Sequence, residues 1–591
     1  VRIGNFSGFL GDRFTALTEI LHGGDVDVVM GDYLAEATMA GISSMFRDNP
    51  AAQRDFFASP FLRQIKPELA FIAGKKIKVI VNAGAFNPRG LAESLRTMID
   101  DQGLALTVAY LEGDDVLDSL AEYQGQGTLN HLDTGAPLDL TGQNLVAANA
   151  YLGGWGITEA LKAGADIVIA GRVADASMVT GPAAWWHEWQ LDDWNRVAGA
   201  VVAGHVIECG PQPAGGNFSG FDSIPNPVTL GFPVAEVAED GSFVVTKHDG
   251  TGGAVTVDTV TAQLLYEIQG TRYLNPDVVV HIDTIEVVQQ APDRVAVTGI
   301  VGSAAPDTTK IGIFAEYGYK GTFFGFVTGL RADAKVGLLD TQLRGFVDPL
   351  GITELRVQPM GRPVADPASQ WEATMPLYIA ATADTKEALQ NLHAAFMGLG
   401  LSSYPGWYTD GSTSIGPRTE YIPGVMLQSD LTQTVHLPDG TSSTVPVVSG
   451  KPVAAQPRHD VSSVPSPEHG TDDVALALGD LVYARSSDKG ANSDLGVWTQ
   501  NQRTAKWLTG FLTIDKLREL LNEPAGVAIE RYELPNLNGL AFVLRGHLGS
   551  SGASNLDADM LSKALSEFLR AKIVSVPADI AAYATTHQED Q

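Results

Sequence analysis

Short apolar runs that alternate with amphipathic segments fill the first 285 residues, and this pattern constrains the fold most. VDVVM at 26–30, KVIV at 78–81 and ADIVIAG at 165–171 are separated by segments with helical periodicity. Strands that are apolar on both faces are typical of parallel sheets covered by helices on both sides. We therefore predict an α/β domain with a Rossmann-like parallel sheet over residues 1–285. Ligands bind beyond the carboxyl ends of such strands, so polar residues there are candidates for a site.

The pattern changes near residue 286 and again near residue 438. Residues 286–437 alternate apolar and polar side chains and include helical segments, which predicts an α+β extension of the first domain. Residues 438–472 contain no aromatic residue and many prolines and serines, which is typical of a linker. Residues 473–591 combine short strands with amphipathic helices, and we predict a small ferredoxin-like α+β domain there.

Charge and cysteine content exclude several classes of function. The chain has 591 residues, and its 39 Lys and Arg against 69 Asp and Glu give a net charge of −30. Such an acidic surface repels nucleic acids and anionic membranes, so we expect neither as a partner. A single cysteine forms no internal disulfide or thiolate metal centre, and no signal segment is visible, which favours a cytoplasmic location. Large α/β enzymes often associate, so we expect a homo-oligomer.

The stretch GHVIECGPQPAGGNF at 204–218 brings reactive side chains close together. It contains Cys209, the only cysteine, with these neighbours: His205, Glu208, Gly215, Gly216 and Asn217. Together they would supply a nucleophile, an acid or base, and oxyanion donors. The alternative is that Cys209 is a small buried apolar residue. His205, Glu208 and Asp175 are also suitable ligands for a divalent metal, but the spacing is common and we predict no metal.

Polar residues follow three of the predicted strands. Asp32 and Glu36 are four residues apart, which would place them on one face of a helix, either as ligands or as cap and dipole partners. Asn82 and Asn87 follow the next strand, as turn formers or as substrate ligands. Because the carboxyl ends of parallel strands share one edge, we expect these side chains to converge on a substrate.

Two further sets of charged residues are candidates for substrate binding. Arg172 and Asp175 follow ADIVIAG. They form a structural ion pair, or Arg172 acts as a clamp for a carboxylate or phosphate. Lys247 precedes a glycine-rich segment suited to the phosphates of CoA, unless this is a surface hairpin.

The C-terminal domain adds one more candidate, the segment RSSDKG with Arg485, Asp488 and Lys489. This segment would meet the first domain's site or a neighbouring subunit, or be a solvated turn. The chain has neither a dinucleotide-binding glycine motif after its first strand nor a P-loop, so we predict no NAD or ATP.

Several of these segments resemble the acyclic terpene utilisation protein A (AtuA) family. The matching stretches are GDYLAE at 31–36, GADIVIAGRVADAS at 164–177, GHVIECGPQPAGGNF at 204–218, GFPVAEV at 231–237, TKHDGTGGAVT at 246–256, QLLYEI at 263–268, YLNPDVV at 273–279 and RSSDKG at 485–490. Ser487 departs from the family, where a glycine is expected. The resemblance implies an N-terminal AtuA domain and a C-terminal ferredoxin-like domain.

The resemblance also implies a function in the breakdown of branched acyclic isoprenoids as CoA thioesters. We expect an enzyme that acts on such an acyl-CoA by lyase, hydratase or thioesterase chemistry, with Cys209, Glu208, His205 and Asp175 as catalytic candidates. CoA would enter only as part of the substrate, and no other cofactor is expected. The alternative is a non-catalytic subunit or assembly partner of an acyl-CoA carboxylase-type complex.

Overall fold

The largest sheet of the N-terminal region is mixed and has five parallel strands at its centre. The computed structural model describes residues 1–591 except 48, 447, 449, 454–471, 553 and 590–591. The strands pair in the order β12-β13-β9-β8-β1-β2-β3-β7-β4-β19-β20. The parallel strands are β1 (Arg2–Ser7), β2 (Val28–Gly31), β3 (Lys78–Val81), β7 (Ile167–Ile169) and β4 (Val108–Glu112).

Antiparallel strands extend this sheet at both edges, which differs from the purely parallel sheet that the apolar runs predict. On one side lie β8 (Pro233–Val237), β9 (Phe243–Lys247), β13 (Arg294–Thr298) and β12 (Glu286–Ala291). On the other lie β19 (Thr434–His436) and β20 (Ser442–Thr444). An apolar run reports burial on both faces of a strand and not the direction of its neighbour, so the sequence alone misses this change.

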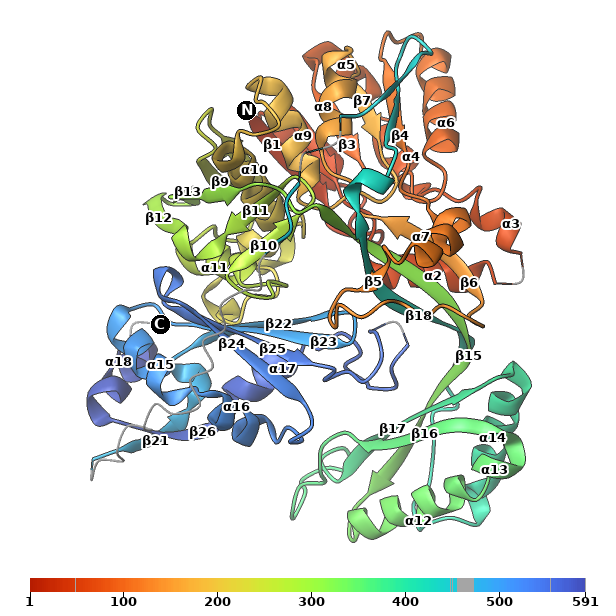
Figure 1. Ribbon diagram of the computed structural model, residues 1–591. Helices are drawn as coiled ribbons and strands as arrows, with labels where there is room; N and C mark the ends of the chain where they lie inside the picture. The colour runs from red at the N-terminus through yellow and green to blue at the C-terminus, as the bar shows by residue number, and fades with distance from the viewer. Residues whose placement is uncertain (48, 447, 449, 454–471, 553, 590–591) are drawn as a thin grey trace.

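Helices cover both faces of the sheet with separate apolar cores (Figure 1). One core includes α1 (Ala16–Gly23), α4 (Pro60–Ile65), α5 (Leu69–Lys75) and α6 (Pro88–Asp101). The other includes α8 (Trp155–Lys162), α9 (Ser177–Trp186), α10 (Trp194–Ile207) and α11 (Val257–Leu264). Helix α10 is rich in small residues and is buried from Val197 to its end, which lets it run through this core.

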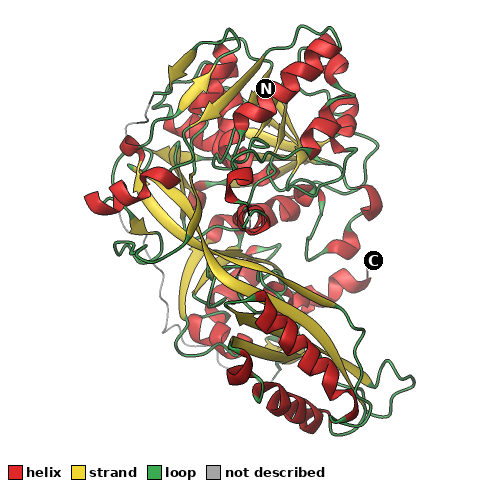
Figure 2. Cartoon of the chain, turned by 90° about the vertical axis from the view of Figure 1, so that its right-hand side faces the viewer, coloured by secondary structure: helices red, strands yellow, loops and turns green. Residues whose placement is uncertain are grey.

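A second, antiparallel sheet is built around one long strand. β15 (Thr308–Thr328) pairs with β17 (Thr374–Ala383) and β18 (Thr413–Leu427), and Figure 2 shows long curved strands that run between the two ends of the molecule. β16 (Ile352–Pro359), β5 (Asn130–His131) and β6 (Leu145–Ala150) complete it. Helices α12 (Ala332–Arg344), α13 (Val347–Leu350) and α14 (Lys386–Gly398) pack on its far end. Because β5 and β6 precede residue 285 while β12 and β13 follow it, the two expected parts interleave.

The segment that the sequence marks as a linker begins with ordered structure. β20 lies within it and pairs with β19 at the sheet edge, and Val445 and Val448 are buried in the first core. Most of the remaining linker, residues 454–471, lies outside the described residues. A three-residue polar edge strand shows no apolar alternation, so composition alone cannot distinguish it from a linker.

The C-terminal domain has a four-stranded antiparallel sheet in the order β22-β23-β25-β24. These strands are β22 (Tyr483–Lys489), β23 (Asn492–Trp498), β25 (Gly539–Arg545) and β24 (Ala528–Leu534). β21 (Val474–Ala477) pairs with β26 (Ile573–Val576), and α15 (Gln502–Phe511), α16 (Ile514–Leu521), α17 (Leu565–Arg570) and α18 (Ala578–Glu589) complete the domain. Asp559 accepts the backbone N–H groups of Lys563 and Ala564 just before α17 begins.

The sheet of this domain packs against the N-terminal region. Trp498, Tyr532 and Val543 belong to the same apolar core as Leu265. Figure 1 shows β22 and β23 lying directly below β10 (Arg272–Asn275) and α11. The remaining small sheet joins β10 to β11 (Val278–His281) and β14 (Val301–Ser303). Within the described residues, no helix has both the length and the apolar character needed to cross a membrane.

Candidate functional site

Asp32 and Asn82 fix the loops that follow two neighbouring parallel strands. The Asp32 carboxylate accepts hydrogen bonds from the Leu34 backbone at 3.0 Å and from Asn82 Nδ2 at 2.6 Å. The other amide atom of Asn82 accepts the backbone N–H of Tyr33 at 2.7 Å. Helix α2 (Glu36–Met45) begins after this loop, so Asp32 and Glu36 do not share a helix face as the spacing predicts. Burial followed by the charge of Asp175 raises the pKa of Asp32 well above its usual range.

Arg172 and Asp175 form an ion pair at the end of β7. The Arg172 guanidinium is 2% exposed and donates to Asp175 Oδ1 at 2.5 Å and to the Leu34 carbonyl at 3.2 Å. It also lies 4.1 Å from the centre of the Tyr151 ring. Burial raises the pKa of Asp175 despite this partner, which brings the carboxyl closer to neutrality. Asp175 also lines a cavity, so the pair is both a structural bridge and part of a candidate site.

Glu36, Tyr151 and Lys310 form the second charged group. Glu36 Oε1 accepts the Tyr151 hydroxyl at 2.8 Å and Lys310 Nζ at 2.5 Å. These residues come from α2, the end of β6, and β15. Burial would raise the pKa of Glu36, but Lys310, Lys489 and Arg172 outweigh it and hold the pKa well below its usual range. Burial raises the pKa of Tyr151, so its phenol stays protonated at neutral pH.

The C-terminal domain supplies the third charged group. Lys489 binds the Glu267 carboxylate, and Ser487 Oγ donates to Glu267 Oε1 at 2.9 Å. Lys563 Nζ lies 2.6 Å from Ser487 Oγ. Burial would raise the pKa of Glu267, but Lys489 and then Lys563 lower it to about 2. Ser487 lies in extended strand β22, so the glycine expected there is not needed for backbone geometry, and its hydroxyl has partners.

These groups surround a cavity of about 350 Å³ between the two domains. Its charged lining consists of Glu36, Asp133, Asp175, Glu267, Arg272, Lys310, Lys489 and Arg545. Its apolar lining consists of Leu132, Ala174, Leu274, Pro276, Pro306, Pro423 and Val425. Asp133, which the sequence gives no clear role, bridges to Arg545 at 2.8 Å and to Asn492 at 2.9 Å. The cavity is thus suited to a ligand with a hydrocarbon part and a polar reacting end.

His205, Glu208 and Cys209 are not among the described residues that line this cavity. His205 Nε2 is 2.8 Å from the Gln263 carbonyl, and Nδ1 is 3.7 Å from Glu208 Oε1. Burial lowers the pKa of His205 to about 4 and raises the pKa values of Glu208 and Cys209 well above their usual ranges. The ring of Tyr273, which lines the cavity, is 5.3 Å from the His205 ring. In the part of the chain that the structure describes, no group of three His, Cys, Asp or Glu side chains is arranged to hold a metal.

The 212–217 loop contacts the C-terminal domain through Arg485. Its guanidinium donates to the Asn217 carbonyl at 2.8 Å and to Gln212 Oε1 at 2.7 Å. The N–H groups of Gly215 and Gly216 donate to the carbonyls of Gln212 and Pro211, so they are engaged within the turn. The loop therefore docks one domain on the other.

The structure places three other predicted residues as follows. Asn87 caps α6, with its side chain accepting the Gly90 N–H at 2.8 Å. Lys247 pairs with Asp293 at 3.1 Å, and no contact recorded among the described residues joins it to the cavity. Burial of Asp488 and, next in size, the negative charge of Glu267 raise the pKa of its carboxyl group to about 7.

Sequence reasoning misses Tyr151, Lys310 and Glu267. Lys310 shares strand β15 with Glu316 and Lys320, so its charge alone does not distinguish it in the sequence. Tyr151 follows a strand that no sequence pattern separates from its surroundings. Glu267 lies in QLLYEI, a segment with no polar cluster.

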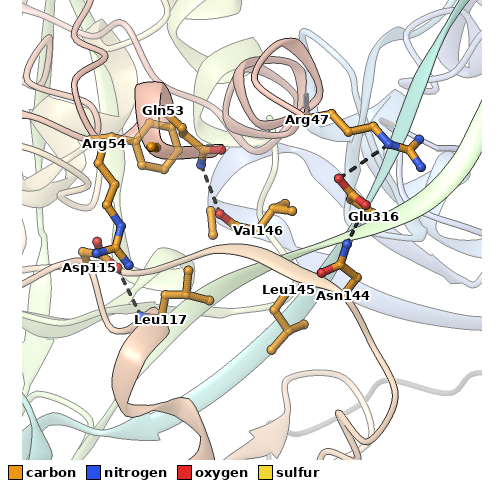
Figure 3. A pocket seen from close by; sticks show the side chains of 12 residues that line it. Arg47, Gln53, Arg54, Asp115, Leu117, Asn144, Leu145, Val146 and Glu316 are labelled. Carbon is orange, nitrogen blue, oxygen red and sulfur yellow. Dashed lines mark hydrogen bonds and ion pairs between the residues drawn. The ribbon is translucent and has the colours of Figure 1, made fainter. Parts of the chain in front are cut away.

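A larger hollow of about 680 Å³ lies near the start of β6 and the middle of β15 (Figure 3). Arg47 and Glu316 lie 3.5 Å apart there, and Asn144 donates to Glu316 at 2.6 Å. Gln53 donates to the Val146 carbonyl at 3.2 Å. Arg54, which also lines it, pairs with Asp118 at 3.1 Å, and none of the sequence candidates lines the hollow.

Comparison with known families agrees with this two-part organisation. The model of the acyclic terpene utilisation family protein AtuA matches residues 1–437, and the model of the AtuA ferredoxin-like domain matches residues 476–575. No curated protein and no solved structure matches the chain. The family match covers most of the chain and includes the segments that carry Asp32, Glu36, Arg172 and Asp175. The chain therefore belongs to the AtuA family of acyclic terpene utilisation proteins and carries its ferredoxin-like domain at the C-terminal end.

Proposed function

We propose that this protein is an enzyme that acts on the CoA thioester of a branched acyclic isoprenoid acid by hydratase or lyase chemistry. What carries the proposal is the cavity in which Asp175, held by Arg172, and the Glu36–Tyr151–Lys310 group lie together with apolar lining residues. Hydrocarbon and acid–base groups in one enclosed volume suit a branched acyl chain whose reacting carbons lie near its thioester.

Each charged group has a distinct role in this proposal. Asp175 has a raised pKa, so it would accept a proton from water or from the substrate. Tyr151 is protonated and contacts Glu36, and it would donate a proton to the carbanion that develops on the substrate. Lys310 and Lys489 would stabilise the negative charge that develops on the thioester oxygen. Hydration of an α,β-double bond and its reverse need only these transfers.

Two of the expected functions, a covalent thioesterase and a carboxylase subunit, receive less support. A covalent thioesterase needs a reactive nucleophile beside the substrate, whereas Cys209 has a raised pKa and is not among the described residues that line the cavity. A carboxylase subunit would be favoured by a C-terminal domain free to dock on another protein. Here that domain contributes Lys489 and Arg545 to the cavity and packs on Leu265, so the enzyme proposal is favoured.

Three variants test the proposal against a set of branched, α,β-unsaturated acyl-CoAs, with products followed by mass spectrometry. Asp175→Asn and Lys310→Met should each lower kcat/KM about 10²- to 10⁴-fold, because a positioned acid, base or oxyanion partner is lost. Lys247→Met removes the same charge from a lysine paired with Asp293 and should retain the wild-type rate within a factor of three. Retention of more than a tenth of the wild-type activity in both cavity variants would contradict the proposal.

A further inference from the structure

Two buried hydrogen-bond donors among the described residues that line the cavity have no recorded partner. They are the NH₂ group of Asn275, which is 1% exposed, and the hydroxyl group of Tyr421, which is 3% exposed. Burial and then the charge of Tyr151 raise the pKa of Tyr421, so a second phenol lies close to this hydroxyl. The Asn275 NH₂ group is the more informative donor, because a buried amide donor without an acceptor costs free energy that a ligand recovers when it supplies one.

The amide of Asn275 is held in one orientation by its oxygen atom. Oδ1 accepts the backbone N–H of Asp277 at 2.9 Å and the hydroxyl of Ser177 at 3.3 Å. Because one atom makes both bonds, the NH₂ group is the part of the side chain that remains for a ligand. Asn275 follows Tyr273 by two residues on β10, so the two side chains share a face of the strand, and both residues line the cavity.

Asn275 is bonded to the turn that carries Asp175. In this turn the N–H of Ser177 donates to the Ala174 carbonyl at 2.8 Å, and Ser177 is the residue whose hydroxyl binds Asn275. Ala174, Asp175 and Asn275 all line the cavity. An ionised carboxylate only accepts hydrogen bonds, and an NH₂ group only donates them. A group held by both must donate and accept, as water or a hydroxyl group does, whereas a carbonyl oxygen only accepts.

We propose that Asn275 holds the water molecule that adds to the substrate, or the hydroxyl group that leaves in the reverse reaction. The inference rests on the proposed function and deepens it, because it assigns the place of the reacting water. Asn275 donates to the water oxygen while one water proton passes to Asp175 and the oxygen bonds to the β-carbon. The π electrons move onto the thioester, and Tyr151 gives a proton to the α-carbon. Asp175 gains one proton and Tyr151 loses one, so a return transfer between them closes the cycle without another reactant.

Two substitutions at Asn275 test this assignment with an unsaturated acyl-CoA that the wild type hydrates. Asn275→Leu removes the donor and should lower kcat about 10- to 100-fold, because the water is no longer held in line with the double bond. The Kd of the saturated acyl-CoA, which binds but cannot react, should stay within about threefold of the wild type, because the acyl chain does not need this donor.

Asn275→Asp keeps an oxygen atom for the bonds from Ser177 and Asp277 and has a donor only while its carboxyl group is neutral. Its kcat relative to the wild type should therefore fall as the pH is raised from about 5 to about 9. A purely structural role of the amide oxygen predicts no such fall, so the pH profile separates the two roles.

Asn195→Asp is the matched control. Asn195 is exposed at the start of α10, its Oδ1 accepts the Gly302 N–H at 2.9 Å, and it is not among the described residues that line the cavity. This variant should keep the wild-type kcat at every pH, and thermal unfolding of all variants checks that the fold is retained.

Three results would contradict the assignment or its basis. If both Asn275 variants follow the wild-type kcat at every pH, Asn275 does not hold the water, and the proposed function still stands. If Asn275→Leu loses activity while Asn275→Asp matches the wild type at every pH, only the amide oxygen matters and the assignment is overturned. Failure of the wild type to hydrate any of the thioesters would overturn the proposed function itself.

Discussion

Burial determines the acid–base behaviour of the residues around Cys209. The thiol is partly exposed, but burial followed by the charges of Glu208 and Glu267 raises its pKa well above the ordinary value. A neutral thiol is a poor nucleophile, because the thiolate is the reactive form. A cysteine in this setting therefore fills space in the wall of the site.

Cys209 should accordingly react slowly and be dispensable for chemistry. Because it is the only cysteine, labelling with a chromogenic disulfide reagent at pH 8 reports on it alone. We expect a rate at least tenfold below that of the urea-unfolded chain, and Cys209→Ser should keep kcat/KM within about threefold of the wild type. Fast labelling together with an inactive serine variant would restore Cys209 as a nucleophile.

His205 should make the folded protein less stable at acidic pH. Burial lowers its pKa from the ordinary 6.5 to about 4, so above pH 6.5 this group does not reduce the free energy of unfolding. Between pH 6.5 and 4 the unfolded chain binds a proton that the folded chain does not, which lowers the free energy of unfolding by about 3 kcal/mol. Urea titrations at pH 7 and pH 4 should show a smaller loss in His205→Gln. Equal losses in the variant and the wild type would contradict this.

At the scale of elements, small residues allow α10 to approach its neighbours closely. A Cβ added at Gly204 would lie 2.3 Å from the Ala176 carbonyl oxygen, at the start of α9 and next to Asp175. The same addition at Gly337, exposed on α12, meets nothing within 4 Å. The two positions therefore separate close packing from helix propensity.

Gly204→Ala should destabilise the protein by about 1–3 kcal/mol, because the methyl group forces α10 away from α9. Gly337→Ala should be neutral or stabilise it by up to about 1 kcal/mol, since alanine is the better helix former. Chemical denaturation measures both. If the two variants have the same stability, close packing of α10 is not what requires glycine at position 204.

At the scale of the whole molecule, the two domains share one apolar core and one charged cavity. Leu265 of the first domain and Trp498, Tyr532 and Val543 of the second lie in the same buried cluster. Lys489 and Arg545 reach the cavity from the second domain. Independent domains often unfold in separate steps, whereas a shared core favours a single transition.

Calorimetry should therefore show one main transition for the full chain. A Cβ at Gly496 would lie 2.6 Å from Leu265 Cβ, so Gly496→Ala should lower the Tm of that transition by several degrees. Gly510→Ala, on the outer helix α15 with nothing within 4 Å, is the control and should not lower it. Two well-separated transitions in the wild type would contradict a shared core.

The sequence by itself determined the family, the ferredoxin-like domain and the polar residues that follow the parallel strands. Asp32 bonds to Asn82 and Arg172 to Asp175, because the carboxyl ends of parallel strands gather at one edge, and of these four Asp175 is among the described residues that line the cavity. The segment at Lys489 was identified as a possible contact with the first domain, which the structure shows.

Only the tertiary structure decided which of these groups share a cavity. Tyr151 and Lys310 reach it through an antiparallel pairing, and Glu267 through the docking of a second domain. It also left Cys209 and His205 out of the described lining of the cavity and placed Lys247 beside Asp293. The physical reason is that burial, partner choice and pKa depend on contacts between residues far apart in the chain, and local pattern reports none of these.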